Sequence, residues 1–172
     1  MTTPRDYLER LIRVDHAGEY GAKRIYQGQL AVLRGTKYQP IIEHMQAQEE
    51  VHLKHFSNLI GARRVRPTAL LPLWHIAGFA LGAATAALGH RAAMACTVAV
   101  EEAIDEHYAA QELALGDDEA ALRTDIGRFR AEELEHRDTG LEHEAELTPG
   151  YRVLSAVIKA GCKIAIKVTE RV

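Results

Sequence analysis

The chain has little cysteine and lacks the alternating pattern of β-branched and polar residues that marks strands. Only Cys96 and Cys162 occur among its 172 residues. Two cysteines are too few for a zinc cluster or a disulfide framework, so we expect a reducing compartment. Ala, Leu, Glu and Arg dominate in place of strand formers, which predicts an all-α protein.

A strong charge of either sign is also missing. The chain has 21 basic and 24 acidic residues, a net charge of −3, which gives no reason to expect a nucleic-acid partner. Its length and 47% hydrophobic content suit a single domain over residues 1–172 with one buried core. Residues 1–30 carry charges throughout, so we expect no secretory or transit segment there.

Four stretches repeat their inward-facing residues every three or four positions, as one face of a helix does. They cover about Arg5–Leu33, Ile42–Leu59, Met94–Leu115 and Leu122–Leu147. Each stretch also carries a carboxylate or imidazole on that face. Because burying an uncompensated charge is costly, these groups need partners.

A glutamate followed by a Glu-x-x-His pair occurs twice. Only two of the nine histidines have a glutamate three residues upstream, and each such pair follows a lone glutamate on a preceding stretch. Residues three apart share one helix face. The repeated pattern comprises Glu19, Glu49, His52, Glu101, Glu133 and His136.

This pattern is the ligand set of ferritin-like bundles that hold two iron or manganese ions. Four carboxylates balance two divalent ions, carboxylates can bridge metals, and each ion gains one imidazole. The adjacent Glu50, Glu102 and Glu132 are less suited, because one residue turns a side chain by about 100° on a helix.

Further polar residues could support the metal ligands from behind. The candidates are Asp15, His107 and Tyr108, and also Asp105 and His143. Each could equally be an ordinary polar group at the surface or at a helix end.

A segment of about residues 67–92 separates the two halves of the pattern, and Pro67 to His90 contains no Asp, Glu, Lys or Arg. Its length would suffice to span a bilayer. A membrane-spanning helix would, however, place the two halves of the metal site on opposite sides of the bilayer. We therefore expect a closely packed crossover helix, buried or lying along a membrane face with Trp74 at the interface.

The C-terminal residues, about 150–170, form an amphipathic helix pattern. A basic row spaced by four residues lies beside an apolar face, which favours binding to a membrane surface. A helix docked on the bundle with a solvated lysine edge would give the same pattern. The basic row consists of Lys159, Lys163, Lys167 and Arg171.

Five motifs resemble the demethoxyubiquinone hydroxylases of ubiquinone biosynthesis, and the resemblance runs from about residue 7 to the C-terminus. They are RVDHAGEYGA (13–22), RVRPT (64–68), AMACTVAVEEAI (93–104), EELEHRD (132–138) and AGCKIAI (160–166).

The resemblance implies a di-iron monooxygenase that hydroxylates the ring of a polyprenylated quinol. It would use O2 and an external electron donor such as NADH, with no catalytic residue beyond the metal ligands. By this resemblance the iron ligands are Glu19, Glu49, His52, Glu101, Glu133 and His136. The protein is then expected on the cytoplasmic face of a bacterial inner membrane, or, as a processed form, on the matrix face of the mitochondrial one. Lipid-binding or other ubiquinone-biosynthesis proteins are expected as partners.

Two other functions fit parts of the pattern. A ferritin-like or rubrerythrin-like iron oxidase or peroxidase would use the same ligands, although the chain lacks a rubredoxin-type cysteine cluster. A metal-free helical membrane adaptor would explain the apolar segment and the basic helix alone.

Overall fold

The computed structural model describes residues 2–172, and within this range it contains α-helices and short 3-10 turns but no strand. The expected all-α class is therefore confirmed. The elements are α1 (Arg5–Leu33), α2 (Gln39–Arg63), α3 (Leu71–Ala87), α4 (His90–Ala114), η1 (Asp117–Glu119), α5 (Ala120–Glu142), η2 (Ala145–Leu147) and α6 (Tyr151–Thr169).

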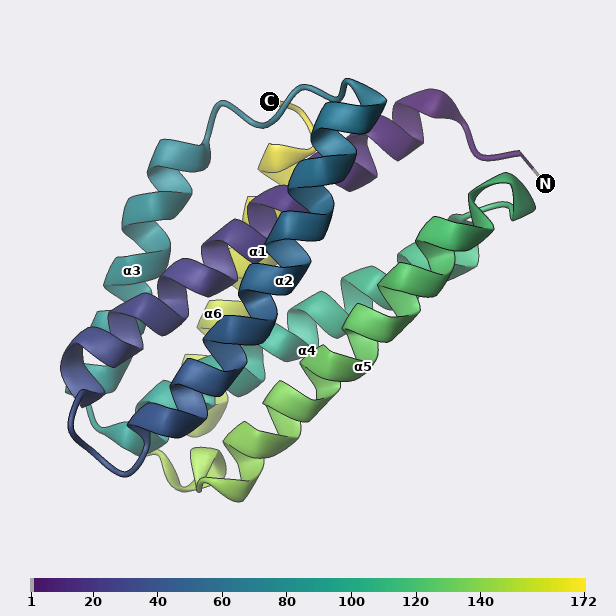
Figure 1. The fold of residues 1–172 in the computed structure, drawn as a ribbon. Helices are drawn as coiled ribbons and strands as arrows, with labels where there is room; N and C mark the ends of the chain where they lie inside the picture. Colours follow the sequence, from purple (N-terminus) through teal and green to yellow (C-terminus); the bar gives the residue numbers. More distant parts are fainter. Residues whose placement is uncertain (1) are drawn as a thin grey trace.

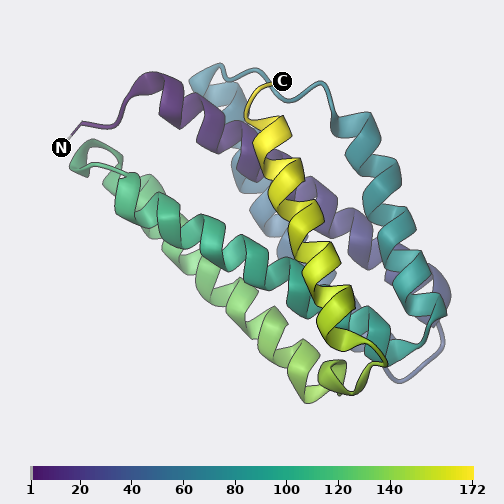
Figure 2. The same ribbon diagram turned by 180° about the vertical axis from the view of Figure 1, so that it is seen from behind.

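Two helical hairpins form the bundle (Figure 1). Helix α1 packs on α2 and α4 packs on α5, while α1 also contacts α4 and α2 contacts α5. Helices α3 and α6 lie outside this four-helix core, and α6 packs on α4 and lies in front of the bundle in the view of Figure 2. The predicted ferritin-like bundle with a crossover helix and an extra C-terminal helix is the observed architecture.

The crossover helix α3 packs very closely on α1 through glycines. A Cβ atom built on Gly82 would lie 1.9 Å from the Ile25 carbonyl oxygen, and one on Gly28 would lie 2.2 Å from the Phe79 carbonyl oxygen. Real Cβ atoms cannot approach so closely, so these positions require glycine. The expectation of a short, closely packed helix is met.

Helix α5 is shorter than the sequence pattern predicts. The apolar row was expected to continue to Leu147, but α5 ends at Glu142 and Leu147 lies in η2. Glu144 has a φ of 67°, a left-handed conformation that ends the helix. Apolar spacing carries no information about this backbone change.

No helix in residues 2–172 is long and apolar enough to cross a membrane. Helix α3 nevertheless exposes large apolar side chains, and Ile76 is 68% exposed. Helix α6 exposes Val157 and Ile164 in the same way.

Half of the basic row on α6 faces acids of α4. Lys159 pairs with Glu102, and Lys163 Nζ lies 2.7 Å from Glu106 Oε2. These two lysines therefore help to dock α6 on the bundle, which is the alternative interpretation of the row.

Candidate metal centre

The six residues of the repeated pattern meet in the middle of the bundle. Each is at most 2% exposed, and all four bundle helices contribute. Helix α1 supplies Glu19, α2 supplies Glu49 and His52, α4 supplies Glu101, and α5 supplies Glu133 and His136.

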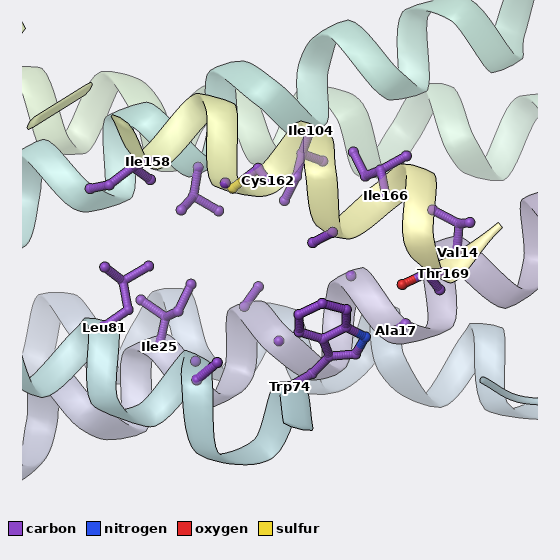
Figure 3. A pocket seen from close by; sticks show the side chains of 18 of the residues that line it. Val14, Ala17, Ile25, Trp74, Leu81, Ile104, Ile158, Cys162, Ile166 and Thr169 are labelled. Atoms are coloured by element: carbon purple, nitrogen blue, oxygen red, sulfur yellow. The ribbon is translucent and has the colours of Figure 1, made fainter. Parts of the chain in front are cut away.

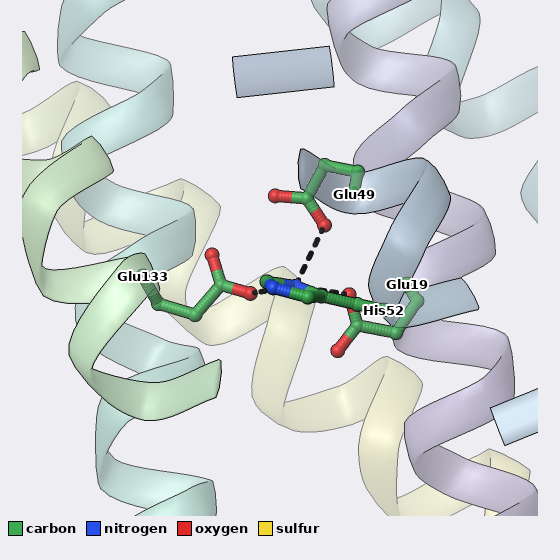
Figure 4. A group of neighbouring side chains, drawn as sticks. All are labelled: Glu19, Glu49, His52 and Glu133. Carbon is green, nitrogen blue, oxygen red and sulfur yellow. Dashed lines mark hydrogen bonds and ion pairs between the residues drawn. The ribbon is translucent and has the colours of Figure 1, made fainter. Parts of the chain in front are cut away.

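These side chains form two overlapping groups that could each hold a metal ion. Within each group, one ligand atom per residue lies within 4.8 Å of all the others. The first group is Glu19, Glu49, His52 and Glu133 (Figure 4); the second is Glu49, Glu101, Glu133 and His136. Glu49 and Glu133 belong to both groups.

Each histidine turns its Nδ1 atom toward the carboxylates. The Nδ1 atom of His52 lies 3.0 Å from Glu133 Oε1 and 3.4 Å from Glu19 Oε2. The Nδ1 atom of His136 lies 3.0 Å from Glu133 Oε2 and 3.2 Å from Glu49 Oε1. Nδ1 is therefore the nitrogen that each ring could offer to a metal.

The outer nitrogens are held by partners from the opposite hairpin. The Nε2 atom of His52 lies 2.6 Å from Glu132 Oε2, and that of His136 lies 2.9 Å from Gln48 Oε1. Such contacts fix the orientation of a ligating imidazole. The sequence pattern places Glu132 only among the less suited ligands and gives no role to Gln48. Both immediately precede the glutamate of a Glu-x-x-His pair, a shared position that singles them out but does not show which histidine each one contacts.

The donor set fits divalent metal ions. All donors are carboxylate oxygens or imidazole nitrogens, which iron and manganese accept. Neither carboxylate oxygen of Glu49 has a hydrogen-bond partner among residues 2–172, although both are buried. Buried polar atoms without partners are unusual, and a bound cation would satisfy them.

Comparison with known proteins identifies the family. The family model described as "Ubiquinone biosynthesis protein COQ7" matches residues 6–169. The chain belongs to the COQ7 family. The resemblance drawn from its motifs is thereby confirmed.

Curated relatives of the COQ7 family match nearly the whole chain. A Rhodospirillum rubrum protein named 3-demethoxyubiquinol 3-hydroxylase is 59% identical over 171 residues, covering 99% of this chain and 81% of the relative. A Bos taurus protein named NADPH-dependent 3-demethoxyubiquinone 3-hydroxylase, mitochondrial, is 57% identical, covering 97% and 79%. A Saccharomyces cerevisiae protein named 5-demethoxyubiquinone hydroxylase, mitochondrial, is 42% identical over 183 residues, covering 96% and 78%.

In this COQ7-family chain two buried tyrosines each donate a hydrogen bond to a carboxylate across the bundle. The Tyr26 hydroxyl donates to Glu101 Oε1 at 2.8 Å, and the Tyr108 hydroxyl donates to Glu19. Tyr26 lies seven residues after Glu19, as Tyr108 lies seven after Glu101. Tyr108 was predicted as a supporting residue. Tyr26 was not, although the shared spacing indicates it.

Burial and crowding shift the pKa values of the clustered groups. Burial, and then the neighbouring Glu133, raises the pKa of both Glu49 and Glu101 well above the usual value. Burial also acts to raise the pKa of Glu133, but hydrogen bonds to His136 and His52 lower it to about 2. Burial acts to lower the pKa of His52, but its contacts with Glu133 and Glu19 raise it to about 11. Without metal, the cluster thus holds protons that a cation would displace.

The other predicted supporting residues lie at different distances from the cluster. Asp15 accepts hydrogen bonds from His107 and Gln111. The predicted residues Asp15 and His107 therefore belong to one polar group, and Asp15 lies one helical turn before Glu19. Asp105 instead pairs with a surface arginine, and His143 donates to the Thr139 carbonyl. Within residues 2–172, neither Asp105 nor His143 forms a hydrogen bond or ion pair with the six clustered residues.

An apolar cavity of about 440 Å³ lies between α6 on one side and α1 and α3 on the other (Figure 3). No Asp, Glu, Lys, Arg or His lines it. On α1 its wall includes Gly18, next to Glu19 in the sequence, and on α4 it includes Val100, next to Glu101. The cavity therefore adjoins the helices that carry one glutamate of each group.

Proposed function

We propose that this chain hydroxylates the ring of a polyprenylated demethoxyubiquinol and that it holds two iron ions to do so. The observation that supports this most directly is the pair of buried, overlapping Glu/His groups next to an apolar cavity. The hydroxylase names of the COQ7-family relatives give the reaction and the substrate class.

Glu19 and His52 would hold one ion, and Glu101 and His136 the other. Glu49 and Glu133 would help to hold both ions, since each belongs to both groups. When bound, the iron ions would supply redox chemistry with O2 that no side chain of the chain can supply. One oxygen atom would enter the ring and the other would leave as water, with two electrons from an external reductant.

The protein contributes placement, charge balance and exclusion of water. The four glutamates would balance the charge of two divalent ions in a buried core. The Tyr26 and Tyr108 hydroxyls hold Glu101 and Glu19 in place from behind. Fixed hydrogen bonds of this kind keep ligands oriented and limit reorganisation during the reaction.

The apolar cavity would receive the quinol. Its wall is almost entirely hydrocarbon, which suits a methylated ring and an isoprenoid tail. Such a cavity also favours an organic substrate over the iron-storage alternative, because hydrated iron gains nothing from an apolar wall.

We propose that the protein lies on a membrane surface with α3 and α6 toward the lipid. Both helices line the cavity, and both expose large apolar side chains such as Ile76 and Ile164. Exposed apolar side chains next to an apolar cavity would let a lipid-soluble quinol enter directly from the bilayer.

The test is conversion of demethoxyubiquinol by the iron-loaded protein in air, with NADH or NADPH as the reductant. We expect a product with one added oxygen atom, and with ¹⁸O2 the product should carry ¹⁸O. A Glu133→Ala variant should give no product. The proposal fails if the iron-loaded protein leaves the quinol unchanged with either reductant, or if Glu133→Ala forms product at the parent rate.

A further inference from the structure

A second cavity, of about 390 Å³, lies between α2 and α5. It is built from the first half of α2 and the last half of α5. Its lining residues are Pro40, Ile41, His44, Met45, Gln48, Glu135, His136, Thr139, Glu142 and His143. The proposed iron chemistry and quinol binding use none of this cavity except His136 and its partner Gln48.

The mouth of this cavity carries polar groups that are free to bind. No hydrogen bond or ion pair engages the side chains of His44, Glu135 or Glu142 within residues 2–172. The Nδ1 atom of His143 donates to the Thr139 carbonyl oxygen at 2.7 Å. That bond leaves the lone pair of His143 Nε2 available. Carboxylates and imidazoles of this kind are ligands for divalent ions.

The inner end of the cavity is His136, which is itself 1% exposed. Its Nε2 atom lies 2.9 Å from Gln48 on the cavity wall, and its Nδ1 atom lies 3.2 Å from Glu49 in the metal centre. A single imidazole ring therefore separates this cavity from the buried carboxylates.

We propose that this cavity is the route by which divalent metal ions reach the centre, with Glu135 and Glu142 attracting the ion at its mouth. The proposal rests on the proposed metal centre. Of the two cavities, the apolar one lacks charged lining, and moving a hydrated dication through it would be costly. The lining of the cavity between α2 and α5 instead includes oxygen and nitrogen donors, among them Glu135, Glu142 and His136.

The test is the rate at which the full-length, metal-free protein takes up Co²⁺, followed by the absorption of bound Co²⁺ in stopped flow at low ionic strength. The Glu135→Gln/Glu142→Gln variant should take up Co²⁺ at least about fivefold more slowly, because fixed charges at a cleft raise the capture rate. Added salt should shrink this difference, since salt screens exposed charges. The final amount of bound Co²⁺ should match the parent.

A charge-matched control is Asp6→Asn/Glu170→Gln, which removes two exposed carboxylates at the far end of the bundle. This control should load at the parent rate. Equal loading rates for the parent and the Glu135/Glu142 variant would overturn the route, and so would equal slowing in the control. A parent protein that takes up no Co²⁺ even at equilibrium would instead overturn the metal centre itself.

Discussion

The outer nitrogen of His52 lies 2.6 Å from a carboxylate oxygen of Glu132, whereas the corresponding nitrogen of His136 meets the neutral amide of Gln48. In both halves of the bundle a side chain from the opposite hairpin contacts the outer histidine nitrogen. That side chain is a carboxylate behind His52 and a neutral amide behind His136. A carboxylate makes an imidazole a stronger electron donor than an amide does. The two metal positions should therefore differ in affinity, with the His52 position the tighter.

Glu132→Gln should weaken binding at the His52 position by about tenfold, the typical effect of losing a supporting contact behind a ligating histidine. Glutamine keeps the shape and can still accept a hydrogen bond, so the fold should persist. Stepwise Co²⁺ titration of the metal-free protein measures the two affinities. Glu50→Gln, which alters an exposed partner of Lys23 and Gln46 outside the cluster, should leave both unchanged.

Removing a shared carboxylate should affect both metal positions, and removing an unshared one should affect a single position. Glu133 belongs to both groups, so Glu133→Ala should reduce bound iron to near zero. Glu19 belongs to one group, so Glu19→Ala should retain about one iron, the one held by the second group. Iron analysis after desalting distinguishes these outcomes. Equal iron loss in both variants would contradict the shared role of Glu133.

The sequence pattern identified the six clustered residues because each requirement was local. Glu49 and His52 lie one helical turn apart, and so do Glu133 and His136. Four apolar stripes that each carry such groups must face one another to cover them. The four bundle helices and the clustering of these six side chains could therefore be predicted before any coordinates were known.

The contacts behind the ligands could not be predicted in the same way. Whether Glu132 meets His52 depends on how two hairpins cross, and periodicity within one helix does not specify that. The end of α5 at Glu142 was missed because it depends on the backbone conformation of Glu144. The cavities likewise depend on how helices pack: the apolar one arises where α3 and α6 lie beside the bundle, and the other where α2 meets α5.

The stability of the metal-free protein should fall as the pH rises. Glu49 and Glu101 have raised pKa values in the folded state, and His52 has one of about 11, so the folded protein holds more protons than the unfolded chain. More bound protons in the folded state make the free energy of unfolding decrease with pH. The pKa of Glu133 in the folded state is instead lowered to about 2. Its ionised form therefore stabilises the fold fully above the ordinary pKa of a glutamate, and this contribution does not change as the pH rises further.

Urea unfolding of the metal-free protein between about pH 5.5 and 8.5 should show this decline. Saturating Co²⁺ should stabilise the protein more at the upper pH, because metal binding displaces the extra protons. A free energy of unfolding that rises steadily over this range would show that the carboxylates are already ionised in the folded state.

Filling the apolar cavity should separate substrate binding from metal binding. Ala165 lines the cavity from α6, and a tryptophan there would fill space in which we propose that the quinol binds. Ala165→Trp should raise the KM for demethoxyubiquinol by at least about tenfold, the cost of losing roughly 1.4 kcal/mol of binding. Its iron content should match the parent. Ala156→Trp, on an exposed part of the same helix outside the cavity, serves as the control and should keep normal activity.

The contact between α1 and α3 should be intolerant of a single methyl group. Gly82→Ala would place a Cβ atom against the Ile25 carbonyl, so the helices must separate, and we expect a loss of about 2–3 kcal/mol in unfolding free energy. Gly61→Ala is the matched substitution in α2, where nothing lies within 4 Å of the new atom. It should instead stabilise the protein by about 0.5–1 kcal/mol through helix propensity. Urea unfolding of both variants gives the comparison, and equal stability of the two would mean that α3 does not depend on this close approach.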